Sequence, residues 1–216
     1  MRKGFILMIM LLTGCNTAPV IVKPTSMDVP VVHIAKHQKI LIIVPSVTAK
    51  NVYSGGPSTP NQFKMDGYAG LMASLAKKGL KEKGFVVATQ EDVRNSQDNP
   101  MEAVLRELTE FTPILASPYK ENAGALPLLK QLEGGMGIDL VCAMSLVVKE
   151  GKPPGYNPMS GEMWQGATSS AFRAALISTS SGQAVWNNEV YVRKPPDDQV
   201  ITKSMELLFK SLTIEK

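Results

Sequence analysis

The chain has 216 residues and a formal net charge of +4, from 23 basic and 19 acidic side chains. Because these charges are nearly balanced and form no block of Lys or Arg, the sequence gives no electrostatic basis for binding nucleic acid. The length suits one well-buried domain with residues to spare.

The first residues have the order of a secretory signal peptide. Arg2 and Lys3 precede an uncharged apolar run over residues 4–12. A helix that spans a bilayer needs about twenty apolar residues, so this run is too short to stay in the membrane and has the length of a signal-peptide core. No later apolar run is long enough to cross a membrane. A cytosolic protein with an apolar start is the alternative interpretation.

The four residues Leu12-Thr13-Gly14-Cys15 resemble the bacterial lipobox, in which an aliphatic residue and two small residues precede a cysteine. This resemblance implies cleavage between Gly14 and Cys15, a diacylglycerol on the Cys15 sulfur, and acylation of the new amine. Two or three acyl chains hold a protein stably on a membrane, whereas one does not. A plain signal peptide is the alternative.

The residues after Cys15 predict where the anchored protein lies. Asn16, rather than Asp, follows the cysteine, which by resemblance to lipoprotein sorting in Gram-negative bacteria favours the outer membrane. Residues 15–37 contain three prolines and few apolar clusters, which predicts an extended, flexible tether. The expected organisation is a signal peptide over 1–14, a lipidated tether over 15–37, and one periplasm-facing domain over 38–216.

The domain is expected to open with a buried strand. Residues 39–45 form a β-branched apolar run, which is typical of a strand buried on both faces. After a Gly/Ser/Pro loop, Thr59, Pro60 and Gln62 give a capped helix start, and Gly84 ends that helix. Residues 85–88 form the next short strand. A right-handed crossover would place the two strands side by side and parallel.

The middle of the chain predicts two helices and a central strand. A helix starts at Asn99-Pro100 and is closed by Pro113. Residues 114–125 are expected to be irregular, and a short helix over 126–133 is stopped by Gly134-Gly135. The nearly continuous apolar run 138–148 predicts a central strand.

The last third predicts a loop, a hairpin and a final helix. Residues 149–166 are rich in Pro and Gly, and strands over 171–177 and 184–192 are joined by a turn at residues 180–183. Asp197-Asp198 starts the last helix. The order β-α-β-α-α-β-β-β-α predicts an α/β (α+β) domain with a mixed sheet of about five strands and helices packed on it.

The element order and the hairpin residues, Phe172 to Ser178 followed by Ser181-Gly182-Gln183-Ala184-Val185-Trp186, resemble a group of bacterial envelope lipoproteins. The group includes the outer-membrane activators of penicillin-binding proteins and the curli-secretion lipoprotein, and the amino-terminal domain of the Tol translocation protein shares the fold. The resemblance implies a non-catalytic partner-binding domain that faces the periplasm. The insert at 114–125 and the loop at 149–166 depart from close members and leave the partner open.

The sequence offers little for catalysis, so no enzyme, cofactor or metal is predicted. His33 and His37 are the only histidines, and both precede the first predicted strand, where a flexible segment positions a base poorly. With Cys15 lipidated, Cys142 has no disulfide partner and is expected to be a buried small hydrophobe. No nucleophile-elbow, zincin or Cys-x-x-Cys motif occurs.

Two segments are candidates for binding. The loop at 149–166 combines aromatic and methionine residues that would anchor a protein partner, unless Trp164 folds back onto the sheet. Its candidate residues are Tyr156, Met159, Met163 and Trp164. The loop after the first strand would lie at the carboxyl end of that strand, where open α/β sheets bind ligands. Its candidate residues are Tyr53, Ser54, Gly55 and Gly56.

The sequence therefore leaves two functions in competition. The first is an outer-membrane-anchored accessory module, without catalysis, for an envelope complex in secretion, surface assembly or cell-wall synthesis. The second is a periplasmic small-ligand binder or enzyme that uses the loop after the first strand. In both cases the membrane is contacted through the lipid on Cys15, and self-association stays open.

Overall fold

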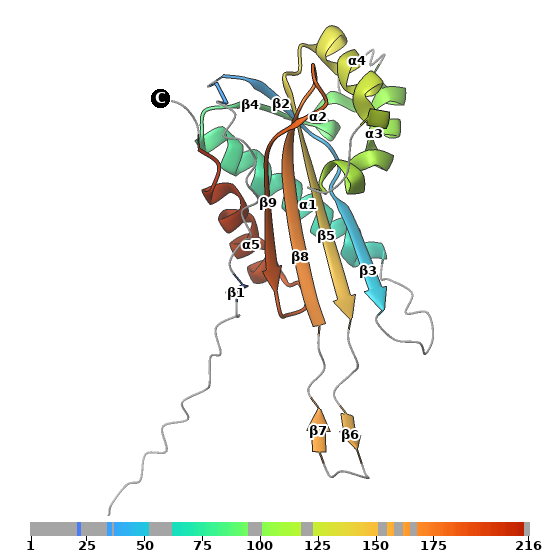
Figure 1. Cartoon of the computed structure of the whole chain (residues 1–216), viewed down its shortest axis with the longest axis vertical. Helices are drawn as coiled ribbons and strands as arrows, with labels where there is room; N and C mark the ends of the chain where they lie inside the picture. Colours follow the sequence, from blue (N-terminus) through green and yellow to red (C-terminus); the bar gives the residue numbers. More distant parts are fainter. Residues whose placement is uncertain are drawn as a thin grey trace, which may run out of the picture.

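The structure of the protein is a computed structural model that describes residues 21–22, 34–35, 37–51, 62–94, 101–117, 123–150, 155–157, 162–164 and 168–213. Within these residues, the main sheet contains the strands β1 (Ile21–Val22), β2 (Lys39–Ile42), β3 (Ser46–Asn51), β4 (Val86–Thr89), β5 (Leu140–Glu150), β8 (Thr168–Ser178) and β9 (Ala184–Val192). Their order is β1-β9-β8-β5-β2-β4, and β3 also pairs with β5 (Figure 1).

The helices cover both faces of this sheet. They are α1 (Gln62–Glu82), α2 (Gln90–Arg94), α3 (Glu102–Leu115), the short 3-10 helix η1 (Ala123–Ala125), α4 (Leu126–Met136) and α5 (Asp198–Lys210). A second, two-stranded sheet is formed by β6 (Gly155–Asn157) and β7 (Glu162–Trp164). The predicted mixed sheet with helices packed on it is confirmed.

The central strand β5 divides the core into two layers because alternate side chains of a strand point to opposite faces. Cys142, Met144 and Leu146 contribute to the core under α1 and α5. Val141 and Ala143 contribute to the core under α2, α3 and α4. Because helices cover both faces of the sheet at β5, side chains on both faces of this strand are buried, which explains its nearly continuous apolar run.

The strand pairing agrees with the predicted connections. β2 and β4 are parallel neighbours, with Ile40 opposite Val87, as the right-handed crossover predicts. β8 and β9 form the predicted hairpin, and Gly182 takes a positive φ of 70° in its turn. The start of α5 is also confirmed, since Asp197 accepts a hydrogen bond of 2.7 Å from the Val200 backbone N–H.

Strand β3 differs from the expected loop. The predicted strand over 39–45 ends at Ile42, and the chain forms β3 after a three-residue interruption. β3 is parallel to the second half of β5, from Ser46 opposite Ser145 to Asn51 opposite Glu150. Val47 and Ala49 pack against the α1 and α5 core, which is the apolar contact that the strand gains.

Two helices run past the residues that were expected to end them. α3 continues through Pro113 to Leu115, because Leu115 and Ala116 are buried in the core under α3 and α4. α4 continues through Gly134-Gly135 to Met136 and ends at Gly137, whose φ is 60°. A Cβ at Gly135 would lie 3.1 Å from the Met101 Cε, so this glycine allows the two helices to approach closely.

Two further segments form strands where a tether and a loop were expected. Ile21 and Val22, within the predicted tether, pair with Val192 and Tyr191 as β1. β6 and β7 lie within the predicted loop at 149–166, beyond the ends of β5 and β8 (Figure 1). Over the described part of the chain, no helix has both the length and the apolar character needed to cross a membrane.

Candidate functional site

The interruption between β2 and β3 is a β-bulge. Ile42 is opposite Cys142 and Ser46 is opposite Ser145, so the segment from β2 to β3 has one residue more than β5 between these pairs. A bulge bends its strand and leaves a backbone group outside the ladder, and bulges are common beside functional sites. Here the freed group is the Val44 backbone N–H.

The side chain of a buried glutamine, Gln90, accepts a hydrogen bond from this backbone N–H. The Val44 N–H donates to the Gln90 Oε1 atom at 3.1 Å. The Gln90 Nε2 atom donates to the Leu105 carbonyl at 3.1 Å and to the Thr109 Oγ1 atom at 3.0 Å. Gln90 is 1% exposed, and it thereby joins the bulge, the start of α2 and the middle of α3. Within the bulge, the Ile43 N–H still bonds to the Cys142 carbonyl of β5, whereas the Val44 N–H is bonded by the Gln90 side chain.

A groove opens at this bend, at the carboxyl ends of the parallel strands β2 and β4. Its volume is about 480 Å³, and α1 and α2 form its walls. Val44, at the bulge, is 39% exposed and contributes an apolar surface. The groove is lined by Ile42, Ile43, Val44, Pro45, Asp66, Ala69, Gly70, Ala73, Ser74, Lys77, Thr89, Gln90, Glu91 and Asp92.

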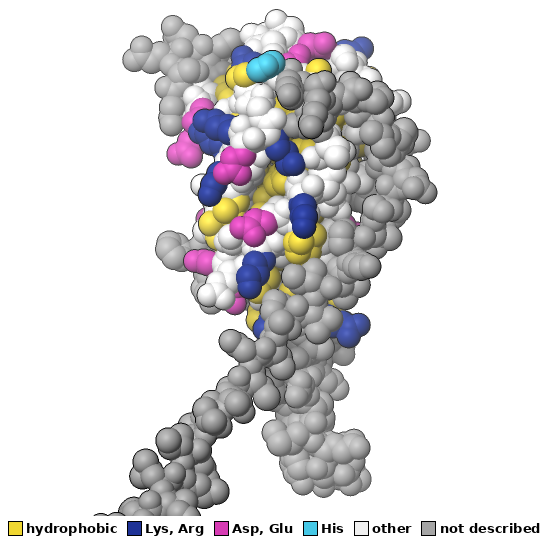
Figure 2. Space-filling view, turned by 90° about the vertical axis from the view of Figure 1, so that its left-hand side faces the viewer, with side chains coloured by type: hydrophobic (Ala, Val, Ile, Leu, Met, Phe, Trp, Pro, Cys, Tyr) yellow, Lys and Arg dark blue, Asp and Glu magenta, His cyan; other side chains and the backbone are white. Residues whose placement is uncertain are grey.

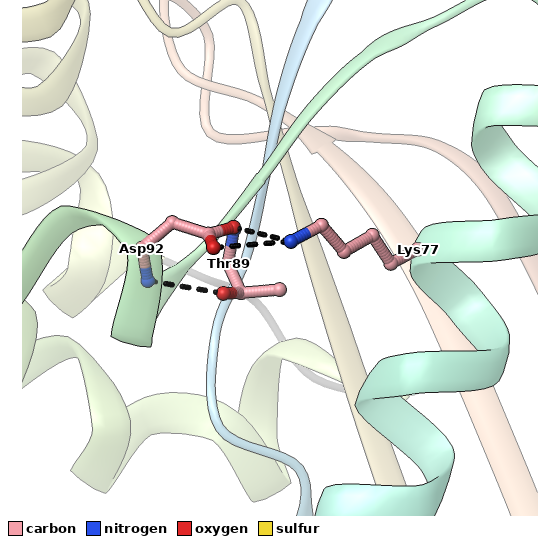
Figure 3. Close-up of polar contacts among 3 residues, drawn as sticks. All are labelled: Lys77, Thr89 and Asp92. Atoms are coloured by element: carbon pink, nitrogen blue, oxygen red, sulfur yellow. Dashed lines mark hydrogen bonds and ion pairs between the residues drawn. The ribbon is translucent and has the colours of Figure 1, made fainter.

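Three residues bond to one another across the groove, from α1 to the start of α2 (Figure 3). The Asp92 N–H donates to the Thr89 Oγ1 atom at 3.1 Å, and the Thr89 N–H donates to the Asp92 carboxylate at 2.8 Å. This reciprocal pair is a capping box for α2. Lys77 on α1 donates to both carboxylate oxygens, at 3.0 and 2.8 Å. Mainly because of the hydrogen bond from Lys77, the pKa of Asp92 falls from 3.8 to about 2.

The described residues of the groove favour the binding of a ligand by shape complementarity rather than a catalytic reaction. Lys77 and Asp92 neutralise each other, and Gln90 is fully used in structural bonds. In the described ranges, no three His, Cys, Asp or Glu side chains gather as a metal site would require. Cys142 is fully buried in the core under α1 and α5, and burial raises its thiol pKa to about 12, so it is a poor nucleophile.

A second, smaller groove of about 300 Å³ lies between α1 and α5. Leu75, Met205 and Phe209 line it together with charged residues of both signs. Figure 2 shows hydrophobic side chains between basic and acidic ones on this face. Gly79 lies close to the Phe209 ring, with 3.9 Å between a Cβ built at Gly79 and the Phe209 Cβ. The two helices therefore pack closely here, and the groove is a seam between them.

The residues predicted from sequence are only partly described. Cys15 and Gly14 lie outside the described residues, as do Met159 and the loop residues Tyr53, Ser54, Gly55 and Gly56. That loop follows β3 rather than the first buried strand, so β3 separates it in sequence from the carboxyl end of β2. The described residues that line the groove at β2 and β4 come from other segments.

The other predicted residues lie in the β6–β7 hairpin. Tyr156 is opposite Met163, and Gly155 is opposite Trp164. The segment expected to be a loop therefore contains two paired strands that bring three of the four candidate partner-binding residues together. His37, one of the two histidines that precede the first predicted strand, is exposed with a φ of 68°, and His33 lies outside the described residues.

Sequence reasoning missed Gln90, Lys77 and Asp92. Thr89-Gln90-Glu91-Asp92 has the spacing of a capping box, which could have indicated the short helix α2. The bonds from Gln90 to Val44 and Thr109 join segments far apart in sequence, so no local pattern indicates them.

No protein-family model matches the chain, and no curated protein matches its sequence. Among solved structures, the chain is similar to the PelC dodecamer from Paraburkholderia phytofirmans, with 14% identity over 90% of this chain and 100% of that chain, at a TM-score of 0.43. It is similar to the lipoprotein GNA1162 from Neisseria meningitidis, with 15% identity over 72% and 80% of the chains and a TM-score of 0.34. It is also similar to the LpoB C-terminal domain from Salmonella enterica, with 11% identity over 74% and 86% and a TM-score of 0.33. A lipoprotein is thus among the similar solved structures.

Proposed function

We propose that this chain is a lipoprotein of the bacterial outer membrane, anchored by acyl chains on Cys15 and facing the periplasm. The domain acts as a non-catalytic accessory module for an envelope complex in secretion, surface assembly or cell-wall synthesis. The order of basic residues, apolar run and lipobox at residues 2–15 supports the anchor.

One observation carries the accessory role. The groove lies at the carboxyl ends of β2 and β4, where an α/β sheet commonly holds its ligand. Here Lys77, Thr89 and Asp92 are bonded to one another. The Gln90 side chain is bonded separately, to Val44, Leu105 and Thr109. An active site needs a nucleophile and a base aimed at a substrate position. Lys77, Asp92 and Gln90 are instead aimed at protein atoms, so they stabilise the bend and the walls of the groove.

The anchor is tested by labelling cells with radioactive palmitate. We expect label on the wild-type protein and none on Cys15→Ser, which is left soluble or unprocessed. Cys142→Ser is the matched control, because it removes the other cysteine and should keep the label. A Cys15→Ser protein that still takes up palmitate would refute the anchor.

The accessory role is tested by chemical crosslinking in intact cells, followed by mass spectrometry. We expect a discrete set of envelope proteins on the wild type and weaker capture after deletion of residues 153–163. The deletion should leave circular dichroism and the melting temperature unchanged, because β5 and β8 pair along their own lengths. If the deleted protein captures the same proteins equally well, the hairpin has no part in the function.

The groove favours a second function, the binding of a small apolar ligand. Its volume of about 480 Å³ lies within the range of small-molecule sites, and Val44 supplies exposed apolar surface. Native mass spectrometry of protein purified from cells should then show a bound mass. Ala73→Phe, which fills the groove, should lose that mass, whereas Lys130→Phe on α4 should keep it. Equal bound mass in both variants would exclude this function.

A further inference from the structure

The pairing of β1 shows which end of the domain lies nearest the anchor. Ile21 is opposite Val192 and Val22 is opposite Tyr191, in antiparallel orientation. The N-terminal end of β1 therefore points toward the end of the sheet at which β9 finishes. Val192 is also opposite Ser170, near the start of β8. This is the end from which the β6–β7 hairpin extends (Figure 1).

The same pairing shortens the free tether. Cys15 precedes Ile21 by six residues, which span at most about 22 Å when fully extended. If the chain were free as far as Lys39, the 24 residues from Cys15 would span up to about 86 Å. With β1 in the sheet, the domain stays close to the leaflet that holds the lipid.

The hairpin has a comparable reach on the same side. Glu150, the last residue of β5, is opposite Thr168, the first residue of β8. Gly155 begins β6 five residues later, at most about 18 Å further on. β6 and β7 lie beyond the ends of β5 and β8 (Figure 1). The N-terminal end of β1 and the paired strands β6 and β7 therefore lie at the same end of the sheet.

We propose that the β6–β7 hairpin contacts the lipid leaflet that holds Cys15, so that the domain is attached to the membrane at two points. This inference rests on the proposed lipid anchor. The paired strands carry Tyr156, Met163 and Trp164 and one charged residue, Glu162. Trp and Tyr are enriched at the boundary between membrane and water, because their rings are apolar with one polar atom.

The short tether makes a weak affinity for lipid sufficient. A group held on a short linker meets its site at an effective concentration in the millimolar range. A contact that would not hold a free protein on a membrane can then set the orientation of a tethered one. The sheet would lie with its hairpin end toward the leaflet and with the connection between β8 and β9 away from it. Deleting residues 153–163 would weaken capture of a complex by releasing this orientation.

The test uses the lipoprotein purified from cell membranes and placed in vesicles of phosphatidylethanolamine and phosphatidylglycerol, with or without brominated acyl chains. Trp186→Phe leaves Trp164 as the single tryptophan. Trp164→Phe leaves Trp186, which stacks on Phe209 in the core at 5.6 Å, as the matched control. We expect bromine to quench Trp164 and its emission to shift to shorter wavelength, with Trp186 unchanged.

Each outcome decides one claim. If the protein floats with the vesicles and Trp164 is quenched no more than Trp186, the hairpin contact is wrong and the anchor stands. If the protein does not float and carries no lipid mass, the anchor fails and the two-point attachment fails with it. A photo-crosslinking residue in place of Tyr156 should join lipid in intact cells. A protein adduct of one discrete mass in place of the lipid adduct would overturn the proposal in favour of a protein partner.

Discussion

Replacing Gln90 by Met should loosen the bend beside the groove. Met has a similar volume and no hydrogen-bonding amide, so the packing change is small. The bonds lost are the one from the Val44 N–H and those from the Gln90 amide to Leu105 and Thr109. The Leu105 carbonyl keeps the Thr109 hydroxyl at 2.8 Å, so the Val44 N–H is the group left without its partner.

The magnitude follows from these bonds. Hydrogen bonds contribute about 0.5–1.5 kcal/mol each, and an unpaired buried group costs about 1–3 kcal/mol. Because Val44 is partly exposed, we take the lower end and expect the free energy of unfolding to fall by about 2–3 kcal/mol. For a domain of this size, the melting temperature falls by about 2–4 °C per kcal/mol.

Urea unfolding followed by circular dichroism measures this loss, and hydrogen exchange at the Val44 amide should become faster. Glu91→Met, on an exposed position of the same helix, is the control and should change stability by less than about 0.5 kcal/mol. In a double-mutant cycle, Gln90→Met and Thr109→Val should be non-additive, because their side chains are bonded. If Gln90→Met is as stable as Glu91→Met and the Val44 amide still exchanges slowly, the bend is held by something else.

Three other substitutions or modifications test single groups. Asp92→Asn should cost about 1 kcal/mol near pH 7, reduced by the exposure of the ion pair. Folding lowers the pKa of Asp92 from 3.8 to about 2, so this stabilisation is present above about pH 4 and disappears as the pH falls to 2. The difference in urea midpoint between the wild type and Asp92→Asn should therefore shrink over that pH range. Thr112→Val should raise stability by about 1 kcal/mol, because the buried Thr112 hydroxyl has no hydrogen-bond partner among the described residues; a lower urea midpoint would contradict this. Cys142, with its thiol pKa raised to about 12, should react with a thiol reagent at pH 8 only after unfolding, and reaction in the native protein would show that its layer opens.

The regular parts of the fold were predictable because local pattern and tertiary contacts agree there. The apolar run that became β5 is buried on both faces. In α5, Ile201, Met205 and Leu208 have helical spacing and all lie in one core. The capping side chain of Asp197 marks the start of this helix in sequence and in structure.

The prediction failed where a distant contact overrides the local signal. Pro113 lacks the N–H that an interior helical residue donates, and was therefore expected to end the helix. α3 nevertheless continues to Leu115, because Leu115 and Ala116 are buried in the core. Gly134-Gly135 has poor helix propensity, but Gly135 gives room for Met101. β3 follows Pro45, a residue that usually ends a strand, and exists because β5 offers it a partner edge.

The candidate site was less predictable than the fold for the same reason. Loop composition led the prediction to Tyr53 and Gly55, which lie outside the described residues, so that prediction stays untested. The groove that the structure does describe lies where the bulge meets the start of α2 and the side of α1. The bulge is a difference of one residue between two ladders, and a single sequence does not contain the register. Nothing in the sequence distinguishes Gln90 from other polar residues, because its bonds to Val44 and Thr109 form only in the folded structure.

The strand β1 connects these points to function. Val20-Ile21-Val22 is a short β-branched run within a proline-containing segment, and two strand residues have little stability alone. The edge of β9 supplies their partners, Tyr191 and Val192. With these two pairs in place, six residues separate Cys15 from β1, whereas 24 separate it from Lys39 at the start of β2. Under the proposed lipid anchor, the end of the sheet that carries Tyr156 and Trp164 would therefore be the end nearest the lipid.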